Sequence, residues 1–347
     1  MDEAVFGDPK KALLSRPWLP TGCSYCFTGS KAVIFVTGLC DDGCYYCPVS
    51  RDKLGSDVFF VNEEKLNLDE LEIEIERSNA VGASLTGGDP LVIPERTIEL
   101  TKRLKSSFGS SFHIHLYTSG RYATREVLWD LYSSGLDEIR FHPTRDIFLN
   151  RINWAAEIKD WSVGVEIPIS TNLESWAKDV IKYAEKAGAG FVNLNEMEVS
   201  PSNIHKLKAM GLKPSIRKPV VESAFETGMK IVEWARRQAL KINVHFCPAT
   251  YKDFIQTRNR FRRTGFVDAK PYEEVTVEGT LRYGVLRNCR DLVMKYDIEY
   301  INEEYRLPPI EEWVRNIARE HHCEGFIEEA HPTRNREPVI ESARIYP

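Results

Sequence analysis

Short apolar runs recur along the chain and predict buried β-strands. The first run, residues 32–37, is continuously apolar rather than alternating, which is typical of a parallel strand covered on both faces. Comparable runs follow at residues 82–86, 113–118, 138–142, 163–169, 191–195 and 242–247. Their repetition predicts a sheet of parallel strands.

Amphipathic stretches between these runs predict helices. They cover residues 95–106, 125–133, 173–187 and 224–240, and Pro94 is a start signal for the first of them. Strands and helices that alternate at intervals of roughly 25 to 50 residues indicate the right-handed crossovers of a parallel sheet or barrel. The predicted fold class is therefore α/β, with its chemistry at the carboxyl ends of the strands, where the loops of a barrel converge.

The alternation of strands and helices ends near residue 264. Residues 275–277 and 281–285 predict a hairpin, and residues 310–319 predict a final helix. We therefore expect an N-terminal segment over residues 1–30, a barrel over residues 31–264 and a C-terminal α+β extension over residues 265–347.

Composition narrows the class of protein. The chain has 347 residues, of which 42% are hydrophobic and 28% charged, so a sizeable core can form. The net charge of -5 and the isoelectric point near 6.0 exclude a general attraction to nucleic acid or to an anionic membrane surface. The N-terminus begins acidic, and no run is apolar enough for a signal peptide or a membrane span. We expect a cytoplasmic protein without a membrane partner.

Five of the eight cysteines lie between residues 23 and 47, which indicates metal binding rather than a disulfide framework. Cys40, Cys44 and Cys47 follow the first strand with spacings that allow three thiolates to ligate one 4Fe-4S cluster. One iron then has no protein ligand. Such an iron can bind a small chelating molecule and pass it an electron at low potential, as the homolytic cleavage of a sulfonium requires.

A structural zinc site is the alternative interpretation of these cysteines. The Cys23-x2-Cys26 and Cys44-x2-Cys47 pairs also fit a zinc ribbon, which would make the chain a binding protein without catalysis. The zinc interpretation leaves Cys40 without a role. A second motif follows the next strand, in which two glycines allow close backbone approach to a ligand and a carboxylate can accept from an ammonium group. These residues are Gly87, Gly88 and Asp89.

The combination of the two motifs resembles the radical S-adenosylmethionine (radical SAM) superfamily, including the aromatic Tyr46 before the last cysteine. Within it, residues 20–260 most resemble uncharacterised archaeal-type proteins related to the pyruvate formate-lyase activating enzyme. The resemblance implies a partial barrel of about six strand–helix units. It also implies reductive cleavage of S-adenosylmethionine at the cluster, giving a 5'-deoxyadenosyl radical that abstracts hydrogen from a substrate.

The resemblance assigns roles and partners as well. Gly87, Gly88 and Asp89 match the motif that holds the methionine amino group, and the backbone near Tyr46 matches the adenine contact. Asp89 stands where glutamate is commoner and has the shorter reach. An electron donor such as ferredoxin or flavodoxin is implied, whereas fold and motif leave open whether the substrate is a protein, an RNA or a small molecule.

Further polar residues at predicted strand ends are candidates to contact the cofactor. Arg140 or His142 would suit the methionine carboxylate, and Glu166 would suit ribose hydroxyls or a substrate amine. The alternative is that these residues are internal hydrogen-bonding groups of the barrel. The remaining candidates are Thr118, Ser119 and Asn195.

A second metal site is predicted from cysteines outside the loop. Cys23 and Cys26 follow a proline and a glycine that favour a tight knuckle, and His245 and Cys247 lie two residues apart, on one face of a strand. If these four residues converge, their ligands suit structural zinc or an auxiliary iron-sulfur cluster. The alternative is that the cysteines are unligated thiols.

Three other groups of residues have less specific patterns. Cys289 and Cys323 are isolated and are predicted to be ordinary buried thiols. His331, Arg334 and Arg336 suit either a substrate clamp or plain surface. A basic segment suits an RNA-facing helix or, alternatively, a solvated helix with its aromatic residues turned to the core. This segment contains Lys252, Arg258, Arg260, Arg262 and Arg263, interleaved with Tyr251, Phe254 and Phe261.

Overall fold

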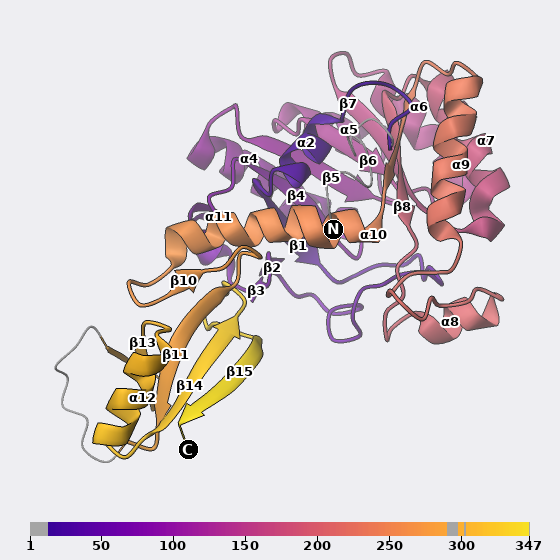
Figure 1. The fold of residues 1–347 in the computed structure, drawn as a ribbon. Coiled ribbons are helices and arrows are strands. Elements are labelled where there is room, and N and C mark those ends of the chain that lie inside the picture. The colour runs from indigo at the N-terminus through magenta and orange to yellow at the C-terminus, as the bar shows by residue number, and fades with distance from the viewer. Residues whose placement is uncertain (1–12, 290–297, 302, 347) are drawn as a thin grey trace. The chain divides into compact units, whose positions relative to one another are not determined.

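The computed structural model describes residues 13–289, 298–301 and 303–346 (Figure 1). Their contacts form two compact units. The first takes in the residues up to Cys26 with Lys31–Glu72 and Val81–Phe254, and the second takes in Phe27–Ser30, Ile73–Ala80 and the residues from Ile255 onward. No helix in the described ranges is both long and apolar enough to cross a membrane.

The first unit is built on a nine-stranded sheet in the order β3-β2-β1-β4-β5-β6-β7-β8-β9. Strand β1 and the strands from β4 to β9 run parallel to one another. Strands β2 (Phe60–Val61) and β3 (Glu64–Lys65) form an antiparallel edge next to β1. The α/β class is confirmed, and the described sheet is open, with β3 and β9 at its edges. The parallel strands are β1 (Lys31–Thr37), β4 (Gly82–Gly87), β5 (His113–Thr118), β6 (Glu138–Phe141), β7 (Ser162–Ile169), β8 (Phe191–Glu196) and β9 (Asn243–Cys247).

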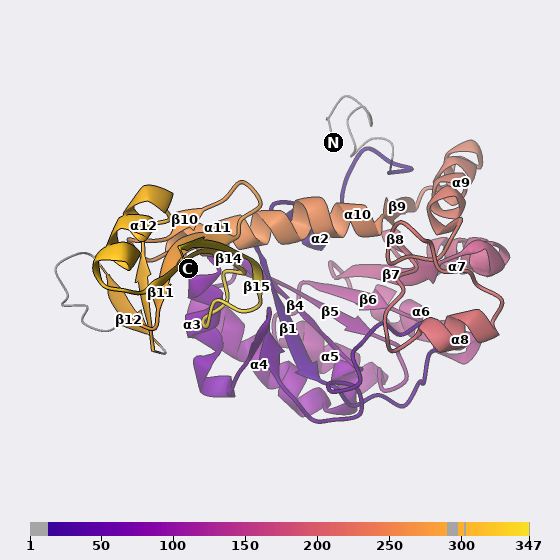
Figure 2. The same cartoon turned by 60° about the horizontal axis from the view of Figure 1, so that its bottom comes forward.

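Helices connect the parallel strands. The four predicted helices are present, and α4 begins at Pro94, one residue before the predicted start, whereas three shorter helices were not predicted. Figures 1 and 2 show α4 and α5 on one face of the sheet and the N-terminal helix α2 (Thr21–Phe27) on the other. The predicted helices are α4 (Pro94–Phe108), α5 (Arg125–Ser133), α7 (Glu174–Ala187) and α9 (Ala224–Arg237); the others are α3 (Leu71–Arg77), α6 (Asn150–Ala156) and α8 (Ile204–Ala209).

The two faces of the sheet differ in chemistry, although both are buried. Alternate residues of a strand point to opposite faces, and on β5 Ile114 and Leu116 are fully buried. On β6, Glu138 and Arg140 are also buried, and they contact the backbone of Gly22 and the side chain of Cys23 on α2. The face covered by α2 is therefore polar at this point.

The second unit has an antiparallel sheet in the order β12-β13-β11-β14-β15, with β10 (Glu274–Val275) paired to β11 (Leu281–Arg287). The predicted hairpin and final helix are confirmed by the β10–β11 pair and by α12 (Glu311–Glu320). Val314 and Ile317 of α12 pack against the sheet. The other elements are α11 (Arg258–Asp268), β12 (Glu299–Ile301), β13 (Glu304–Leu307), β14 (Glu324–Ala330) and β15 (Val339–Tyr346).

Cys289 and Cys323 form a disulfide in this unit, so the prediction of two isolated thiols is wrong. Strands β11 and β14 are antiparallel neighbours in which Arg287 lies opposite Glu324. The end of one strand and the start of the other are therefore adjacent. This register brings together two cysteines that are 34 residues apart in sequence.

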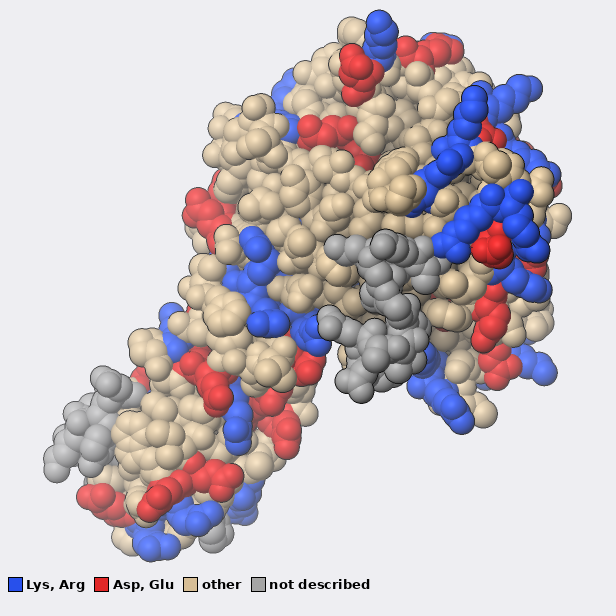
Figure 3. Space-filling view, turned by 45° about the horizontal axis from the view of Figure 1, so that its top comes forward, with Lys and Arg blue, Asp and Glu red and all other residues tan. Residues whose placement is uncertain are grey.

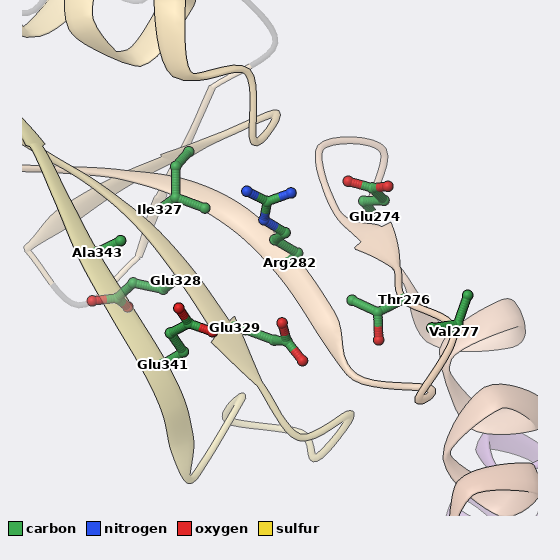
Figure 4. A pocket seen from close by; sticks show the side chains of 9 residues that line it. All are labelled: Glu274, Thr276, Val277, Arg282, Ile327, Glu328, Glu329, Glu341 and Ala343. Carbon is green, nitrogen blue, oxygen red and sulfur yellow. The ribbon is translucent and has the colours of Figure 1, made fainter. Parts of the chain in front are cut away.

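A pocket of about 320 Å³ lies on the same sheet (Figure 4). Its lining includes Glu274, Arg282 and Glu329, which lie opposite one another on neighbouring strands. Arg282 is therefore flanked by two carboxylates, and oppositely charged cross-strand neighbours stabilise a sheet.

Candidate active site

The loop after β1 carries Cys40, Cys44 and Cys47. All three thiols are partly exposed and none is in a disulfide. Gly43 has a φ of 60°, in the left-handed region that glycine adopts without steric cost, and it turns the chain between the first two cysteines. The loop therefore presents its three thiols at the carboxyl end of the first parallel strand.

Backbone hydrogen bonds join this loop to the turn after β4. The Gly88 N–H donates to the Thr37 carbonyl at 2.8 Å, and the Asp89 N–H donates to the Leu39 carbonyl at 2.9 Å. A Cβ atom on Gly88 would lie 2.3 Å from the Leu39 carbonyl oxygen, so the two backbones can approach this closely only because the residue is glycine. The loop and the turn predicted to bind the cofactor are thus joined side by side.

The Asp89 carboxylate is directed into the protein. It is 2% exposed and accepts from the Ser119 hydroxyl at 2.6 Å, the Ser119 N–H at 3.0 Å and the Thr118 hydroxyl at 2.9 Å. The Leu91 N–H donates to it as well, at 3.0 Å. Burial raises the pKa of Asp89 above its usual value, and these hydrogen bonds offset only part of that increase. Asp89 therefore fixes the end of β5 to the glycine turn. Thr118 and Ser119 are the hydrogen-bond donors that hold its carboxylate.

Replacing Asp89 by Ala should destabilise the protein, because two buried backbone N–H groups and two hydroxyls lose their acceptor. We expect a loss of about 3 kcal/mol in the free energy of unfolding, measured by urea denaturation. Asp52→Ala, which removes an exposed carboxylate, is the matched control and should leave the unfolding midpoint nearly unchanged. Equal midpoints for the two variants would contradict an anchoring role for Asp89.

His142 links the cysteine loop to β7. Its Nδ1 lies 2.8 Å from the Glu166 carbonyl, which can only accept, so Nδ1 carries the proton and Nε2 accepts from the Tyr46 hydroxyl at 2.9 Å. Burial lowers the pKa of His142, against the Glu166 carbonyl, which raises it, and this favours the neutral ring that the arrangement requires. His142 thereby holds Tyr46 in place.

The sequence did not single out four further residues that hold the loop. Asp42 accepts from Arg121 at 2.9 Å and from the Thr144 hydroxyl at 2.9 Å. Burial raises the pKa of Asp42, but these contacts and Ser119 hold it below its usual value. Asn203 is fully buried and donates to the Tyr46 carbonyl at 3.0 Å. The only sequence signal was the position of Asp42 between the cysteines.

A buried layer of charged residues lies beneath the loops. Arg140 pairs with Glu138 at 2.5 Å and with Glu166 at 2.8 Å, and Asn193 and Asn195 donate to Glu166 at 3.0 and 2.9 Å. Arg140 is 1% exposed. It is therefore engaged by two carboxylates of the protein, and its predicted contact with a methionine carboxylate has no support here.

Glu166 should make stability depend on pH in acid. Burial would raise its pKa, but Arg140, Asn195 and Asn193 lower it to about 2, from an ordinary value of 4.5. A carboxylate with a depressed pKa in the folded state stabilises the protein above its unfolded pKa, and this contribution is lost as the pH falls through the folded pKa. At pH 7 it should amount to about 3 kcal/mol. The difference in unfolding free energy between wild type and Glu166→Gln should shrink as the pH falls from 4.5 to 3; a constant difference would contradict this.

Cys23 and Cys26 lie on helix α2, so the predicted knuckle is wrong. The Cys23 sulfur accepts from Arg140 at 3.4 Å and from Asn193 at 3.3 Å, and burial raises the pKa of this thiol to about 12, although Arg140 opposes the shift. Burial lowers the pKa of His245 to about 4, and its Nδ1 lies 3.1 Å from the side-chain amide oxygen of Asn193, Oδ1. These contacts account for Cys23 and His245 without a metal.

In the part of the chain that the structure describes, no three His, Cys, Asp or Glu side chains are gathered closely enough to share one metal ion. The described residues therefore give no support to a mononuclear zinc site, either for the second site with Cys247 or for a zinc ribbon. A cubane cluster spreads its thiolate ligands more widely than a single ion does.

Comparison with known proteins identifies the family. Residues 34–145 match the Radical SAM superfamily. A protein of Methanocaldococcus jannaschii, provisionally named a glycyl-radical enzyme activating enzyme, is 34% identical over 361 residues, which cover 94% of this chain and 92% of that protein. The chain belongs to the radical SAM superfamily. It is an enzyme of a family that uses a 4Fe-4S cluster and S-adenosylmethionine.

Two solved structures are similar to this radical SAM protein at low sequence identity. Coproporphyrinogen III oxidase of Escherichia coli is 13% identical with a TM-score of 0.40, over 63% of this chain and 56% of that protein. Methylornithine synthase is 12% identical with a TM-score of 0.41, over 71% of this chain and 84% of that protein. The chain thus spans little more than half the length of the first of these enzymes.

The loop of this radical SAM protein fits a cluster with thiolate ligands. Burial raises the pKa of Cys44 to about 11, and the neighbouring Cys40 and Cys47 add to the shift. Three thiolates side by side repel one another, so they need a positive centre such as iron to be stable together. The chemistry and position of the three thiols therefore match the cofactor of the family.

Two arginines of the second unit form ion pairs within the protein. Arg336 is 4% exposed and pairs with Glu273 at 2.7 Å and with Asp268 at 2.8 Å, and Arg334 pairs with Glu74 at 3.0 Å. The second unit thus uses these two arginines as internal ion-pair partners rather than as plain surface, and no contact of theirs supports a substrate clamp.

The basic segment near residue 251 is divided between different environments. Lys252 pairs with Glu198 at 2.7 Å within the first unit, and Arg263 donates to the Asn79 carbonyl within the second. Phe261 is buried and Phe254 is 55% exposed. On the face in Figure 3, blue Lys and Arg side chains are interspersed with red Asp and Glu side chains. The ion pair of Lys252 and the burial of Tyr251 and Phe261 favour the solvated helix over an RNA-binding surface.

Proposed function

We propose that this protein is a radical SAM activating enzyme whose 4Fe-4S cluster is held by Cys40, Cys44 and Cys47 and whose substrate is another protein. The supporting observation is the pair of backbone hydrogen bonds that joins the cysteine loop to Gly88 and Asp89. A ligand bound at an open iron of this loop would lie beside the glycine turn. When bound, the cluster would supply the electron for reductive cleavage of S-adenosylmethionine.

The residues around the loop position the cofactor. Gly87 and Gly88 lack side chains that would keep the methionine amino group from the backbone, and Asp89 holds their turn against β5. Tyr46, fixed by His142 and Asn203, orients the loop backbone that would contact adenine.

Two residues of the buried charged layer, Glu166 and Asn195, support a role in binding. Asn195 lies near the carboxyl end of β8 and donates to Glu166 within β7, and Arg140 holds Glu166 ionised. An ionised carboxylate there would accept from ribose hydroxyls or from a substrate amide.

The name of the Methanocaldococcus jannaschii relative supports a protein substrate, because an enzyme that activates a glycyl-radical enzyme acts on a glycine of another protein. One-electron cleavage of S-adenosylmethionine also needs a reductant such as ferredoxin or flavodoxin. Zinc-ribbon binding without catalysis is the second hypothesis, and no contact among the described residues favours it.

Anaerobic reconstitution with iron and sulfide tests the proposal. The expected product is a brown protein with about four irons per chain that, with dithionite, converts S-adenosylmethionine to methionine and 5'-deoxyadenosine. A glycyl-radical enzyme with α-deuterated glycine should transfer deuterium into the 5'-deoxyadenosine. A colourless protein that binds zinc and leaves S-adenosylmethionine intact would overturn the proposal.

A further inference from the structure

The segment from residue 199 to residue 221, between β8 and α9, is strongly basic. It contains five Lys and Arg residues and no Asp or Glu, in a chain whose net charge is -5. All five cations are exposed, and none forms an ion pair within 4.0 Å with a residue that the structure describes. We call this surface the basic patch; its cations are Lys206, Lys208, Lys213, Arg217 and Lys218.

Two large aliphatic side chains are exposed within the basic patch. Ile216 is 98% exposed and Met210 is 52% exposed. Exposed aliphatic residues surrounded by charge are typical of protein-binding surfaces, where the apolar groups supply contact area and the charges orient the partner.

The basic patch is built directly onto the cysteine loop. Leu207 of α8 and Leu212 belong to a buried cluster that packs against Tyr45 and Tyr46 of that loop. Within the same segment, Asn203 donates to the Tyr46 carbonyl at 3.0 Å. Both ribbon views show α8 beside the chain that follows β1 (Figures 1 and 2). A protein docked on the patch would therefore lie next to the residue that precedes Cys47.

We propose that the basic patch docks an acidic electron-carrier protein that reduces the cluster one electron at a time. This inference rests on the proposed function, because only a cluster at Cys40, Cys44 and Cys47 needs that electron. In each encounter the reduced carrier loses one electron and the oxidised cluster gains it, with no proton or group transferred. Opposite charge on the carrier would steer the encounter and orient its redox centre towards the cysteine loop.

The composition of the patch favours a protein partner over RNA. Surfaces that bind single-stranded RNA combine cations with aromatic rings on which bases stack. Residues 199–221 contain no Phe, Tyr or Trp. The exposed apolar groups are Ile216 and Met210, which suit the aliphatic and aromatic contacts of a protein interface.

Charge reversal with a matched control tests the docking surface. The test variant is Lys208→Glu with Arg217→Glu, and the control is Lys159→Glu with Lys186→Glu. The control residues are exposed and lie just before β7 and β8. They are therefore near the amino ends of the parallel strands, whereas the cysteine loop is at the carboxyl ends. The probe is an acidic plant-type ferredoxin. Its binding to each reconstituted enzyme is measured at equilibrium, and cluster reduction is followed by stopped-flow absorbance.

The test variant should bind oxidised ferredoxin at least ~10-fold more weakly than wild type at low salt, and its second-order rate of reduction by ferredoxin should fall by a similar factor. Both differences should shrink at high salt, because screening shortens the range of the charges. The control variant should behave as wild type. Ile216→Ala should weaken binding with little change in its salt dependence.

Dithionite separates this inference from the proposed function. It reduces the cluster without docking, so dithionite-driven cleavage of S-adenosylmethionine should be equal in wild type, test variant and control, which also shows that the variants fold. Absence of cleavage in all three would overturn the proposed function. Normal cleavage with ferredoxin binding unchanged in the test variant would overturn the docking surface, and loss of single-stranded RNA binding in that variant instead would assign the patch to nucleic acid.

Discussion

Cys44→Ala should abolish both the cluster and the cleavage of S-adenosylmethionine. The loop offers three thiols to a cluster that already lacks a fourth protein ligand, so the variant leaves only Cys40 and Cys47. We expect the iron content after anaerobic reconstitution to fall from about four per chain to nearly none. The low-temperature electron paramagnetic resonance signal of the reduced cluster and the formation of 5'-deoxyadenosine should disappear together.

Cys26→Ala is the matched control. This thiol is also partly exposed and outside any disulfide, but it lies on α2 rather than on the loop. Iron content and cleavage should both survive its removal. Retained cleavage in Cys44→Ala would remove that residue from the site, and loss of iron in Cys26→Ala would place a ligand on α2.

Arg140→Met should cause the largest loss of stability in the first unit. The substitution keeps much of the apolar volume between the Tyr117 and Phe191 rings, each about 5.3 Å from the guanidinium. It leaves Glu138 and Glu166, which are 0% and 15% exposed at their side chains, without their cation. Breaking a buried ion pair by removing one partner costs about 3–5 kcal/mol, and urea unfolding monitored by circular dichroism measures it.

Two further variants serve as controls for this experiment. Arg125→Met breaks an ion pair with Glu157 whose side chains are both more than half exposed, and it should shift the unfolding midpoint far less. Glu138→Gln combined with Arg140→Met removes one of the two uncompensated carboxylates and should recover part of the stability. If Arg140→Met and Arg125→Met shifted the midpoint equally, the buried layer would not contribute as proposed.

The parallel strands could be predicted from sequence because their apolar runs are long enough to be recognised without tertiary information. The burial of the polar sheet face under α2 could not be predicted from sequence. Along β5, His113, His115 and Tyr117 alternate with apolar residues, which is the pattern of a strand with one solvated face. The structure buries that face because α2 covers it, and nothing within β5 signals the contact.

The site shows the same division between local and distant information. The cysteine spacing and the adjacent glycines are local features, and the structure joins the two loops that carry them. Thr118 and Ser119, which bind Asp89, and Glu166, which binds Arg140, lie on or just after a neighbouring strand, so only the pairing of the strands makes them neighbours. The disulfide between Cys289 and Cys323 was missed for the same reason, since it depends on the alignment of β11 with β14.

The second unit includes Ile73–Ala80, a part of the crossover that leads into β4. Glu74 in that stretch is fully buried and binds Arg334, which is 260 residues further along the chain. During synthesis, Glu74 can therefore gain this partner only after Arg334 has been added to the chain. A gene fusion that exchanged the residues after Phe254 for those of another protein would leave Glu74 without this arginine, so the two units cannot be exchanged as independent cassettes.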